Sequence, residues 1–199
     1  MHISEGVLNP EILIGGVVVS LAFTTYALKK LKNEEIPLVA VFSALFFLAS
    51  FIHVPAGPVS IHLILNGIIG AILGVRAFIA IFIALLLQGV LFGYGGISTL
   101  GINTLNLALP SLLGWYILSL HVKSISLKKV QYFLVGFTSV FVSALFLSIT
   151  LALNGESFID AAKVAFLAHI PVMLIEGVIT MFALMFLDRV YPQIFKRVR

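Results

Sequence analysis

Residues 78–93 read FIAIFIALLLQGVLFG, a run without a charged side chain of the kind that forms a membrane-spanning helix. Such runs recur along the chain: 61% of its 199 residues are hydrophobic, 10% are charged, and the mean hydropathy is +1.18. These values lie outside the range of soluble globular domains. Because about 20 residues cross the hydrocarbon layer, the chain can hold about seven such helices and no separate soluble domain.

Seven apolar runs are separated by polar or Gly/Pro-rich breaks, and each predicts one transmembrane helix. They lie near residues 12–31, 37–52, 61–73, 78–93, 105–120, 130–153 and 161–187. The predicted fold class is an all-α integral membrane bundle of seven helices. It forms a single domain over residues 1–199, with an N-terminal segment at 1–10, the spans within 11–188 and a basic tail at 189–199.

Two features of these spans leave alternatives open. The third and fourth spans are short and joined by GVRA, so they are either tilted helices or a hairpin that dips into the membrane without crossing it. Gly16, Ser20 and Thr24 form a ridge of small residues on the first span, which serves either internal packing or docking of a partner. For Gly67 and Gly70 of the third span we expect ordinary bundle packing.

The basic residues predict the orientation in the membrane. With the N-terminus outside, eleven of the twelve Lys and Arg residues fall on the cytoplasmic side, and only Lys163 falls outside. The eleven are Lys29, Lys30, Lys32, Arg76, Lys123, Lys128, Lys129, Arg189, Lys196, Arg197 and Arg199. We therefore expect a multi-pass protein of a prokaryotic cytoplasmic membrane, with its N-terminus outside and its C-terminus in the cytoplasm.

The opening stretch MHISEGVLNP is unusual for such a chain. No basic region precedes the first apolar run, so a cleaved signal peptide is not expected and the first residues should be retained. In Met1-His2 the α-amine, the deprotonated peptide nitrogen of His2 and its imidazole can wrap one metal ion. Deprotonation of a peptide nitrogen favours Ni(II) or Cu(II) over Mg(II) or Ca(II). The alternative is a solvated tail.

A fourth donor is available on the same outer side, in HVPAGPVSIHLILNG at residues 53–67. His62 begins the third predicted span, flanked by Ser60 and by Asn66 one helical turn later, so it could reach inward. His53 is followed by Pro55 and is expected at the membrane interface, yet it remains the competing choice. The chain has no cysteine, which excludes thiolate ligands and disulfides.

Other polar residues could support such a site. The outer connection FGYGGISTLGINTLNLALP offers side chains that could orient imidazoles and hold the inserted terminus, although ordinary loop composition explains them equally well. They are Ser98, Thr99, Asn103 and Asn106. His169 and Glu176 lie seven residues apart on one face of the last span. Because an intramembrane carboxylate is costly, we expect a hydrogen-bonding role for this pair rather than direct ligation.

Several of these motifs together resemble the NikM/CbiM family. They are MHISEGVL, FIHVPAGPVSIHLILNGIIGAILG, LLLQGVLFGYGGISTLGINTLNLALP and AHIPVMLIEGVIT, in order over nearly the whole chain. Members are the substrate-binding membrane components of energy-coupling factor importers for nickel or cobalt. The resemblance implies a seven-helix bundle whose N-terminal segment folds back, and a square plane formed by the Met1 amine, the His2 peptide nitrogen and imidazole, and His62.

The resemblance also implies the cargo and the partners. The nitrogen-only ligand set and the GPVSIHLILNG form of the motif favour Ni(II), with Co(II) as the alternative. Two cytoplasmic ATPases and a membrane coupling (T) component are expected as partners. The chain ends at KRVR without a fused accessory segment, so any accessory membrane subunit would be a separate polypeptide. Neither a nucleic-acid partner nor a cofactor besides the transported metal is expected.

The expected function is therefore high-affinity capture of a divalent transition metal for ATP-driven import, not enzymatic catalysis. The chain has no P-loop GxxxxGK[ST], so ATP hydrolysis must come from partners. A stand-alone metal permease is one alternative, although only Glu176 could serve as an intramembrane carboxylate relay. An intramembrane metalloenzyme is another, but the HExxH motif is missing.

Overall fold

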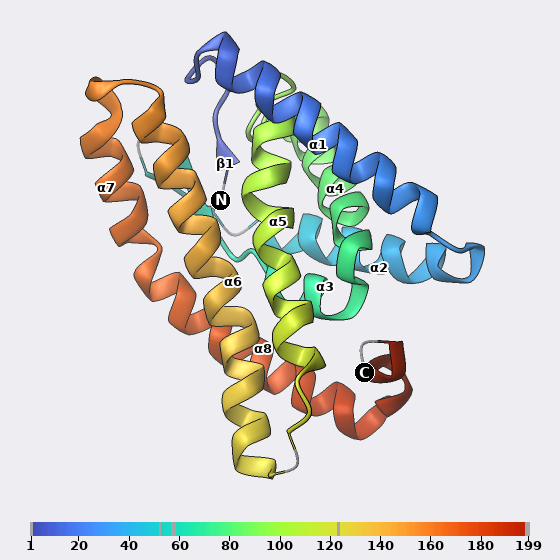
Figure 1. Cartoon of the computed structure of the whole chain (residues 1–199). Helices are drawn as coiled ribbons and strands as arrows, with labels where there is room; N and C mark the ends of the chain where they lie inside the picture. The colour runs from blue at the N-terminus through green and yellow to red at the C-terminus, as the bar shows by residue number, and fades with distance from the viewer. Residues whose placement is uncertain (1, 52, 57–58, 123, 198–199) are drawn as a thin grey trace.

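The computed structural model of the chain is almost entirely helical (Figure 1). It describes residues 2–51, 53–56, 59–122 and 124–197, and of residues 53–56, 59–61, 196 and 197 it describes the backbone alone. The α-helices of these residues are α1 (Pro10–Lys30), α2 (Ile36–Ala49), α3 (Asn66–Leu73), α4 (Ala77–Phe92), α5 (Leu100–Ser119), α6 (Ile125–Leu153), α7 (Ile159–Ala168) and α8 (Ile170–Val190). Short 3-10 helices are η1 (Asn33–Glu35), η2 (Gly74–Arg76), η3 (Glu156–Phe158) and η4 (Pro192–Arg197). The predicted all-α class is confirmed.

Four helical stretches are long and apolar enough to cross a membrane: Pro10–Lys30, Asn66–Phe92, Ile125–Leu153 and Glu156–Val190. Large apolar side chains on them face outward, such as Ile14 at 64% exposure and Phe182 at 62%. A lipid-facing helix surface requires such side chains. The chain is thus a multi-pass membrane protein, while the number of seven spans and the orientation remain predictions. Lys123 and Arg199, on which the orientation partly rests, lie outside the described residues.

The predicted start of the third span is wrong. Residues 59–62 form strand β3 (Val59–His62), a turn follows at 63–65, and α3 begins only at Asn66. His62 therefore belongs to a strand and does not share a helix face with Asn66. The reason is that the backbone of β3 bonds to two other strands instead of to a helical turn. α3 has 8 residues and is therefore about 12 Å long, which is too short to cross the hydrocarbon layer of about 30 Å by itself.

Two further helix bounds differ from the prediction. α5 begins at Leu100 and not near residue 105, so Asn103 lies on a helix instead of before it, while Asn106 lies within the predicted span. The last predicted span is broken at His169 into α7 and α8. Pro171 lies in the first turn of α8 and has no N–H to bond to the preceding turn, which explains the break.

The small sheet joins the N-terminal segment to the connection between α2 and α3. Its strand order is β1-β3-β2, where β1 is His2–Ile3 and β2 is His53–Ala56. β1 and β3 are antiparallel, with His2 opposite Ser60 and Ile3 opposite Val59. Figure 1 shows β1 among the helices rather than at their periphery. The chain thus turns back at its start and lies against the strand that carries His62.

Close helix packing surrounds α3, all of whose residues are buried. A Cβ on Gly67 would lie 2.5 Å from the Val135 carbonyl oxygen, so only glycine lets α3 approach α6 so closely. The ridge on α1 is internal as well: a Cβ on Gly16 would lie 2.8 Å from Cβ of Ile102 on α5. Internal packing thus accounts for both sets of small residues.

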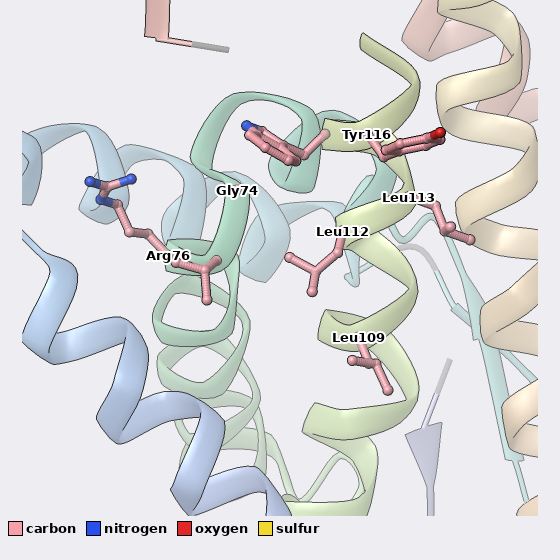
Figure 2. Close-up of a pocket in the computed structure, with 8 residues that line it drawn as sticks. Gly74, Arg76, Leu109, Leu112, Leu113 and Tyr116 are labelled. Carbon is pink, nitrogen blue, oxygen red and sulfur yellow. The ribbon is translucent and has the colours of Figure 1, made fainter. Parts of the chain in front are cut away.

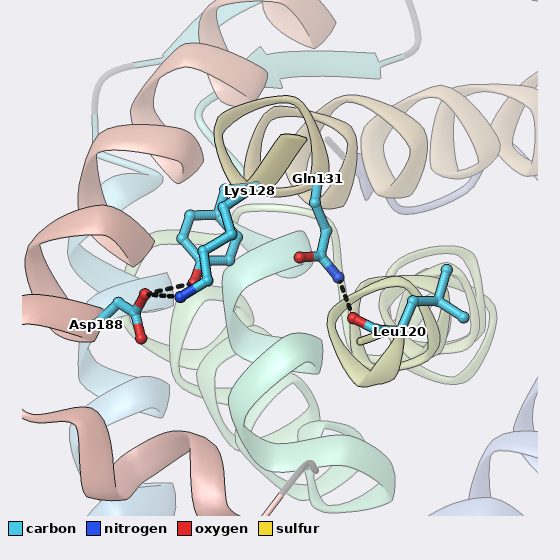
Figure 3. A network of polar contacts seen from close by, with 5 residues as sticks. Leu120, Lys128, Gln131 and Asp188 are labelled. Atoms are coloured by element: carbon cyan, nitrogen blue, oxygen red, sulfur yellow. Dashed lines mark hydrogen bonds and ion pairs between the residues drawn. The ribbon is translucent and has the colours of Figure 1, made fainter. Parts of the chain in front are cut away.

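Polar contacts connect α5, α6 and α8 near one end of the bundle (Figure 3). Lys128 Nζ lies 2.8 Å from Asp188 Oδ2, which also accepts a 3.0 Å hydrogen bond from the Tyr132 hydroxyl. Gln131 donates to the carbonyl oxygen of Leu120, at the end of α5. These side chains fix the end of α8 against α6.

Candidate metal centre

The imidazoles of His2 and His62 face each other inside the bundle. Their side chains come from β1 and β3, and the two residues are 2% and 3% exposed. His2 Nδ1 lies 3.4 Å from His62 Nε2, and the ring centroids are 4.9 Å apart at an interplanar angle of 43°. Two imidazole nitrogens at this separation can bind one transition-metal ion.

The orientation of the His62 ring is fixed by its other nitrogen. Nδ1 lies 2.5 Å from the Leu63 carbonyl oxygen, so it carries the proton and donates. The Nε2 lone pair is thereby directed toward His2, as is usual for a metal-binding histidine. Burial, together with the charge of nearby groups that include His2, lowers the pKa of His62 well below its usual value of 6.5. This strand residue is therefore neutral, the form that binds metal.

The nitrogen of His2 that faces His62 is the one that suits a chelate. A metal bound to Nδ1 and to the peptide nitrogen of the same histidine closes a six-membered ring, which Nε2 cannot do. Met1, the predicted source of the amine donor, lies outside the described residues. Within the described part of the chain, no cluster of three or more His, Cys, Asp or Glu residues could hold a metal. Described side chains supply two imidazoles, so further donors would come from the backbone, the terminus or a side chain that the structure does not describe.

Asn103 on α5 holds β1 in place. Its Oδ1 accepts a 2.8 Å hydrogen bond from the Ile3 N–H, and its Nδ2 donates to the Ile3 carbonyl oxygen at 3.0 Å. Nδ2 also donates to Thr99 Oγ1 at 3.1 Å. Asn103 and Thr99 are 2% and 0% exposed. Of the four polar residues predicted near this connection, these two support the terminus through their side chains.

The loop between α4 and α5 binds the next part of the N-terminal segment. The Glu5 N–H donates to the Gly95 carbonyl oxygen at 2.7 Å, and the Ser98 N–H donates to the Glu5 carboxylate at 3.2 Å. Ser98 thus contributes its backbone rather than its hydroxyl group. Gly96 has a φ of +155° and leaves no room for a Cβ beside the Glu5 side chain.

Asn154, which was not predicted from the sequence, holds the end of the N-terminal segment. Its Oδ1 accepts from the Asn9 N–H at 2.7 Å, and its Nδ2 donates to the Val7 carbonyl oxygen at 2.8 Å. Asn9 Nδ2 donates to the Asn154 carbonyl oxygen at 3.1 Å. An asparagine at the helix end before Gly155 reads as an ordinary cap, so no sequence signal distinguishes this role.

Asn66 and Asn106 bind neighbouring helices. Asn66 Nδ2 donates to the Leu107 carbonyl oxygen at 2.9 Å and to Ser143 Oγ at 2.8 Å. Asn106 Oδ1 accepts from Thr150 Oγ1 at 3.4 Å. These contacts connect α3, α5 and α6.

The remaining predicted residues fall into two groups. His53 and Ser60 belong to β2 and β3, and their side chains lie outside what the structure describes; along the backbone His53 is opposite His62. His169 and Glu176 are both 0% exposed. His169 Nδ1 donates to the Ala165 carbonyl oxygen at 2.6 Å, and the Glu176 carboxylate accepts from the backbone just after His62. Both side chains therefore make hydrogen bonds, and that neither binds the metal directly stays a prediction.

Aromatic rings surround the two imidazoles. The Tyr94 ring lies nearly parallel to that of His2, at 6.4 Å and 19°, and Phe46 meets His62 edge-on at 6.4 Å and 88°. Phe92 continues the aromatic contact from Tyr94 at 5.7 Å. These rings could not be assigned to the site from the sequence, because aromatic residues are common throughout an apolar bundle.

A separate groove of about 650 Å³ opens beside η2 and α5 (Figure 2). Apolar side chains dominate its lining, among them Leu109, Leu112 and Trp115. Arg76 at its edge pairs with Glu35, with 2.6 Å between Nε and Oε2. The residues that line this groove include no histidine, so it is not part of the candidate metal centre.

Comparison with known proteins points to metal transport. A family described as the cobalt uptake substrate-specific transmembrane region matches residues 2–194. A relative from Haemophilus influenzae, named as a metal transport protein, is 36% identical over 99% of this chain and 98% of its own length. The fused nickel transport protein NikMN of Rhodobacter capsulatus is 34% identical over 54% of this chain and 33% of its own length.

Solved structures point the same way. The crystal structure of a truncated transition metal transporter has a TM-score of 0.81 and 27% identity, over 94% of this chain and 98% of that one. A longer transition metal transporter also has a TM-score of 0.81, over 96% of this chain and 93% of that one.

Proposed function

The chain belongs to the CbiM family of cobalt and nickel transport proteins, and from this membership we propose that it captures one Ni(II) ion from outside the cell for ATP-driven import. It is a transport component and not an enzyme. In this proposal it is the substrate-specificity component of an energy-coupling factor transporter. The metal is cargo, bound and later released, rather than a resident cofactor.

The observation that carries the proposal is the 3.4 Å separation of two buried imidazole nitrogens, His2 Nδ1 and His62 Nε2. In a square plane with metal–nitrogen bonds of about 2.0 Å, adjacent corners lie about 2.8 Å apart and opposite corners about 4 Å apart. The chelate would take three successive corners with the Met1 amine, the His2 peptide nitrogen and Nδ1. His62 then takes the corner adjacent to Nδ1, after an approach of about 0.6 Å.

The donor set favours nickel over cobalt. Four nitrogens in a plane suit Ni(II), and strong in-plane bonds compensate for deprotonation of the peptide nitrogen. Co(II) remains the alternative cargo, since relatives are named for transport of either metal. Planar Ni(II) and octahedral Ni(II) absorb visible light differently, so the spectrum of the loaded protein tests the geometry.

Energy for import comes from partners in this proposal. A membrane coupling component and two ATPases drive the bundle to a state that releases the ion inward, with or without a separate accessory subunit. Release requires distortion of the plane or protonation of its nitrogens, because a complete four-nitrogen plane holds the ion tightly. The alternative is a stand-alone permease. Nickel uptake that requires the ATPases supports the proposal, and equal uptake without them favours the permease.

The binding step is tested with three histidine variants of the purified chain. His2→Ala and His62→Ala each remove one of the facing imidazoles and should abolish nickel binding in a competition titration. His121→Ala is the matched control, because His121 is exposed in the connection between α5 and α6. Equal nickel affinity in all three variants would refute the proposed site.

A further inference from the structure

Glu176 bonds to the backbone next to His62 and is not one of the proposed metal ligands. Its carboxylate, on α8, accepts a short hydrogen bond from the Ile64 N–H and bonds of 3.0 Å from the Leu65 N–H to each of its oxygens. The residue is 0% exposed, and none of the ion pairs among the described residues includes it. A carboxyl group buried in a membrane bundle is costly unless it is hydrogen-bonded, and these two amides supply the bonds.

The two amides belong to the turn that connects His62 to α3. Leu65 directly precedes the first residue of α3, Asn66, and Ile64 precedes Leu65, so the carboxylate bonds to N–H groups at and just before the start of that helix. A negative charge at this position is favourable because of the exposed N–H groups and the helix dipole. Glu176, on a different helix, thus places its carboxylate at the N-terminal end of α3.

The backbone of this turn is strained. Leu65 has φ of 56° and ψ of 13° and is the one non-glycine residue with positive φ in the described part of the chain. A leucine does not take this left-handed conformation unless its surroundings hold it there. The Glu176 carboxylate holds the Leu65 N–H with both oxygens, so it supplies that constraint.

We propose that Glu176 is a positioning residue that keeps His62 Nε2 in place for the metal by fixing the turn between β3 and α3. This inference rests on the proposed function. His62 is two residues before Ile64, and its Nδ1 bonds to the carbonyl oxygen of Leu63 within the same turn. When the carboxylate is lost, the turn relaxes and the imidazole that depends on it moves away from His2.

The same contact connects the metal centre to the far end of α8. Helix α8 continues from Glu176 to Asp188, which bonds to Lys128 and Tyr132 of α6 (Figure 3). A shift of α8 along α6 would move the carboxylate relative to the amides of α3.

The test is a double-mutant cycle of Glu176→Gln and His62→Ala, with Cu(II) as the probe. Cu(II) binds nitrogen donors more tightly than Ni(II), so the variant that lacks His62 still yields a measurable affinity. Glu176→Gln should lower the Cu(II) affinity of the otherwise natural chain by about 10–100-fold, as loss of a group that orients a ligand does. In the His62→Ala background it should change the affinity by less than about 2-fold, because the residue through which it acts is gone.

Control variants separate positioning from folding. Thr180 is buried one turn further along α8, and Thr180→Val keeps the shape of its side chain. The Cu(II) affinity of this variant should be unchanged. Glu176→Asp keeps the charge but shortens the side chain, and should lower the affinity by less than Glu176→Gln, again only when His62 is present. It replaces Glu176→Gln in the cycle if that variant does not fold.

The outcomes distinguish this inference from the proposed function. An equal fall in both backgrounds, or no fall in either, would overturn the role of Glu176. If His2→Ala abolishes binding while Glu176→Gln and Glu176→Asp bind as the natural chain does, the proposed function stands and only the positioning role fails. A natural chain that binds neither Cu(II) nor Ni(II) would overturn both.

Discussion

Asn103 satisfies both backbone groups of Ile3, taking the place that a neighbouring strand would take on that side of β1. Ile3 is 0% exposed, so its N–H and carbonyl group have no water to bond to if Asn103 is lost. Each unsatisfied buried group costs about 1–3 kcal/mol. Single polar side chains thus decide whether the N-terminal segment stays in the bundle.

Asn103→Leu is expected to weaken nickel binding by about 10–100-fold, because the segment that carries His2 loses its anchor on α5. The measurement is a competition titration of the purified chain. Thr104→Val is the matched control: its hydroxyl bonds to Leu100 within α5 and does not contact the terminus. Equal affinity of Asn103→Leu and Thr104→Val would show that the anchor is not needed.

In the proposed site, the pH dependence of nickel binding arises at donors other than His62. Burial lowers the pKa of His62 below 6.5, so this imidazole stays neutral as the pH falls through that value. Between about pH 8 and 6.5, protons compete mainly at the α-amine, with a pKa near 7.7–8.0, and at the peptide nitrogen. Affinity should therefore fall on acidification, with about two protons released per nickel ion near pH 7, measured by calorimetry in buffers of different ionisation enthalpy. Binding without proton release would contradict the amine and amide donors.

For single residues, the sequence predicts which side chains can bind a metal better than it predicts which residues they hydrogen-bond to. Met1-His2 and His62 stand out because few polar residues interrupt the apolar runs. That Asn103 bonds to Ile3 is a contact across 100 positions, which no local pattern encodes. Asn154 has a similar role and was missed because an asparagine at a helix end is common.

Strand β3 and helix α3 are the elements that shape the site. The sequence predicts one helix over residues 61–73, because an apolar stretch this short fits a buried helix and a buried strand equally well. Residues 59–62 form a strand because they pair with β1, which lies far away in the sequence. The long helices α1, α4 and α6 were predicted to within a few residues, because length and hydropathy alone define them.

Because α3 packs closely against α6, adding one methyl group at Gly67 should destabilise the fold. Gly67→Ala places a Cβ 2.5 Å from the Val135 carbonyl oxygen and should lower the unfolding free energy by about 1–3 kcal/mol through overpacking. Gly15→Ala on α1 has nothing within 4 Å and should be neutral or slightly stabilising. Thermal unfolding in detergent compares the two variants. Equal melting temperatures would contradict the packing of α3.

The whole molecule is predicted to lie in the membrane with most of its basic residues on the cytoplasmic side. Membrane character follows from composition, and relatives over the full length confirm the family. The path of the N-terminal segment could be predicted from its resemblance to the family but not from hydropathy, because residues 1–10 carry no apolar run.

The orientation is testable because the chain has no cysteine, so single cysteines can be introduced without background labelling. Lys163→Cys should react with a membrane-impermeant maleimide on intact cells. Lys32→Cys should react only after the membrane is opened. Both residues are exposed, so accessibility to the reagent differs only by side of the membrane. The reverse pattern would invert the topology and place His2 at the wrong face for capture from outside.

A peptide extension ahead of Met1 tests the proposal that the first amino group of the chain binds the metal. An uncleaved tag at this end removes the free amine, whereas the same tag after Arg199 leaves it intact. We predict that the N-terminally extended protein folds with an unchanged melting temperature but binds Ni(II) more than about 100-fold more weakly than the C-terminally tagged protein. Equal nickel affinity of the two tagged proteins, with the same visible spectrum, would show that the first amino group is not a ligand.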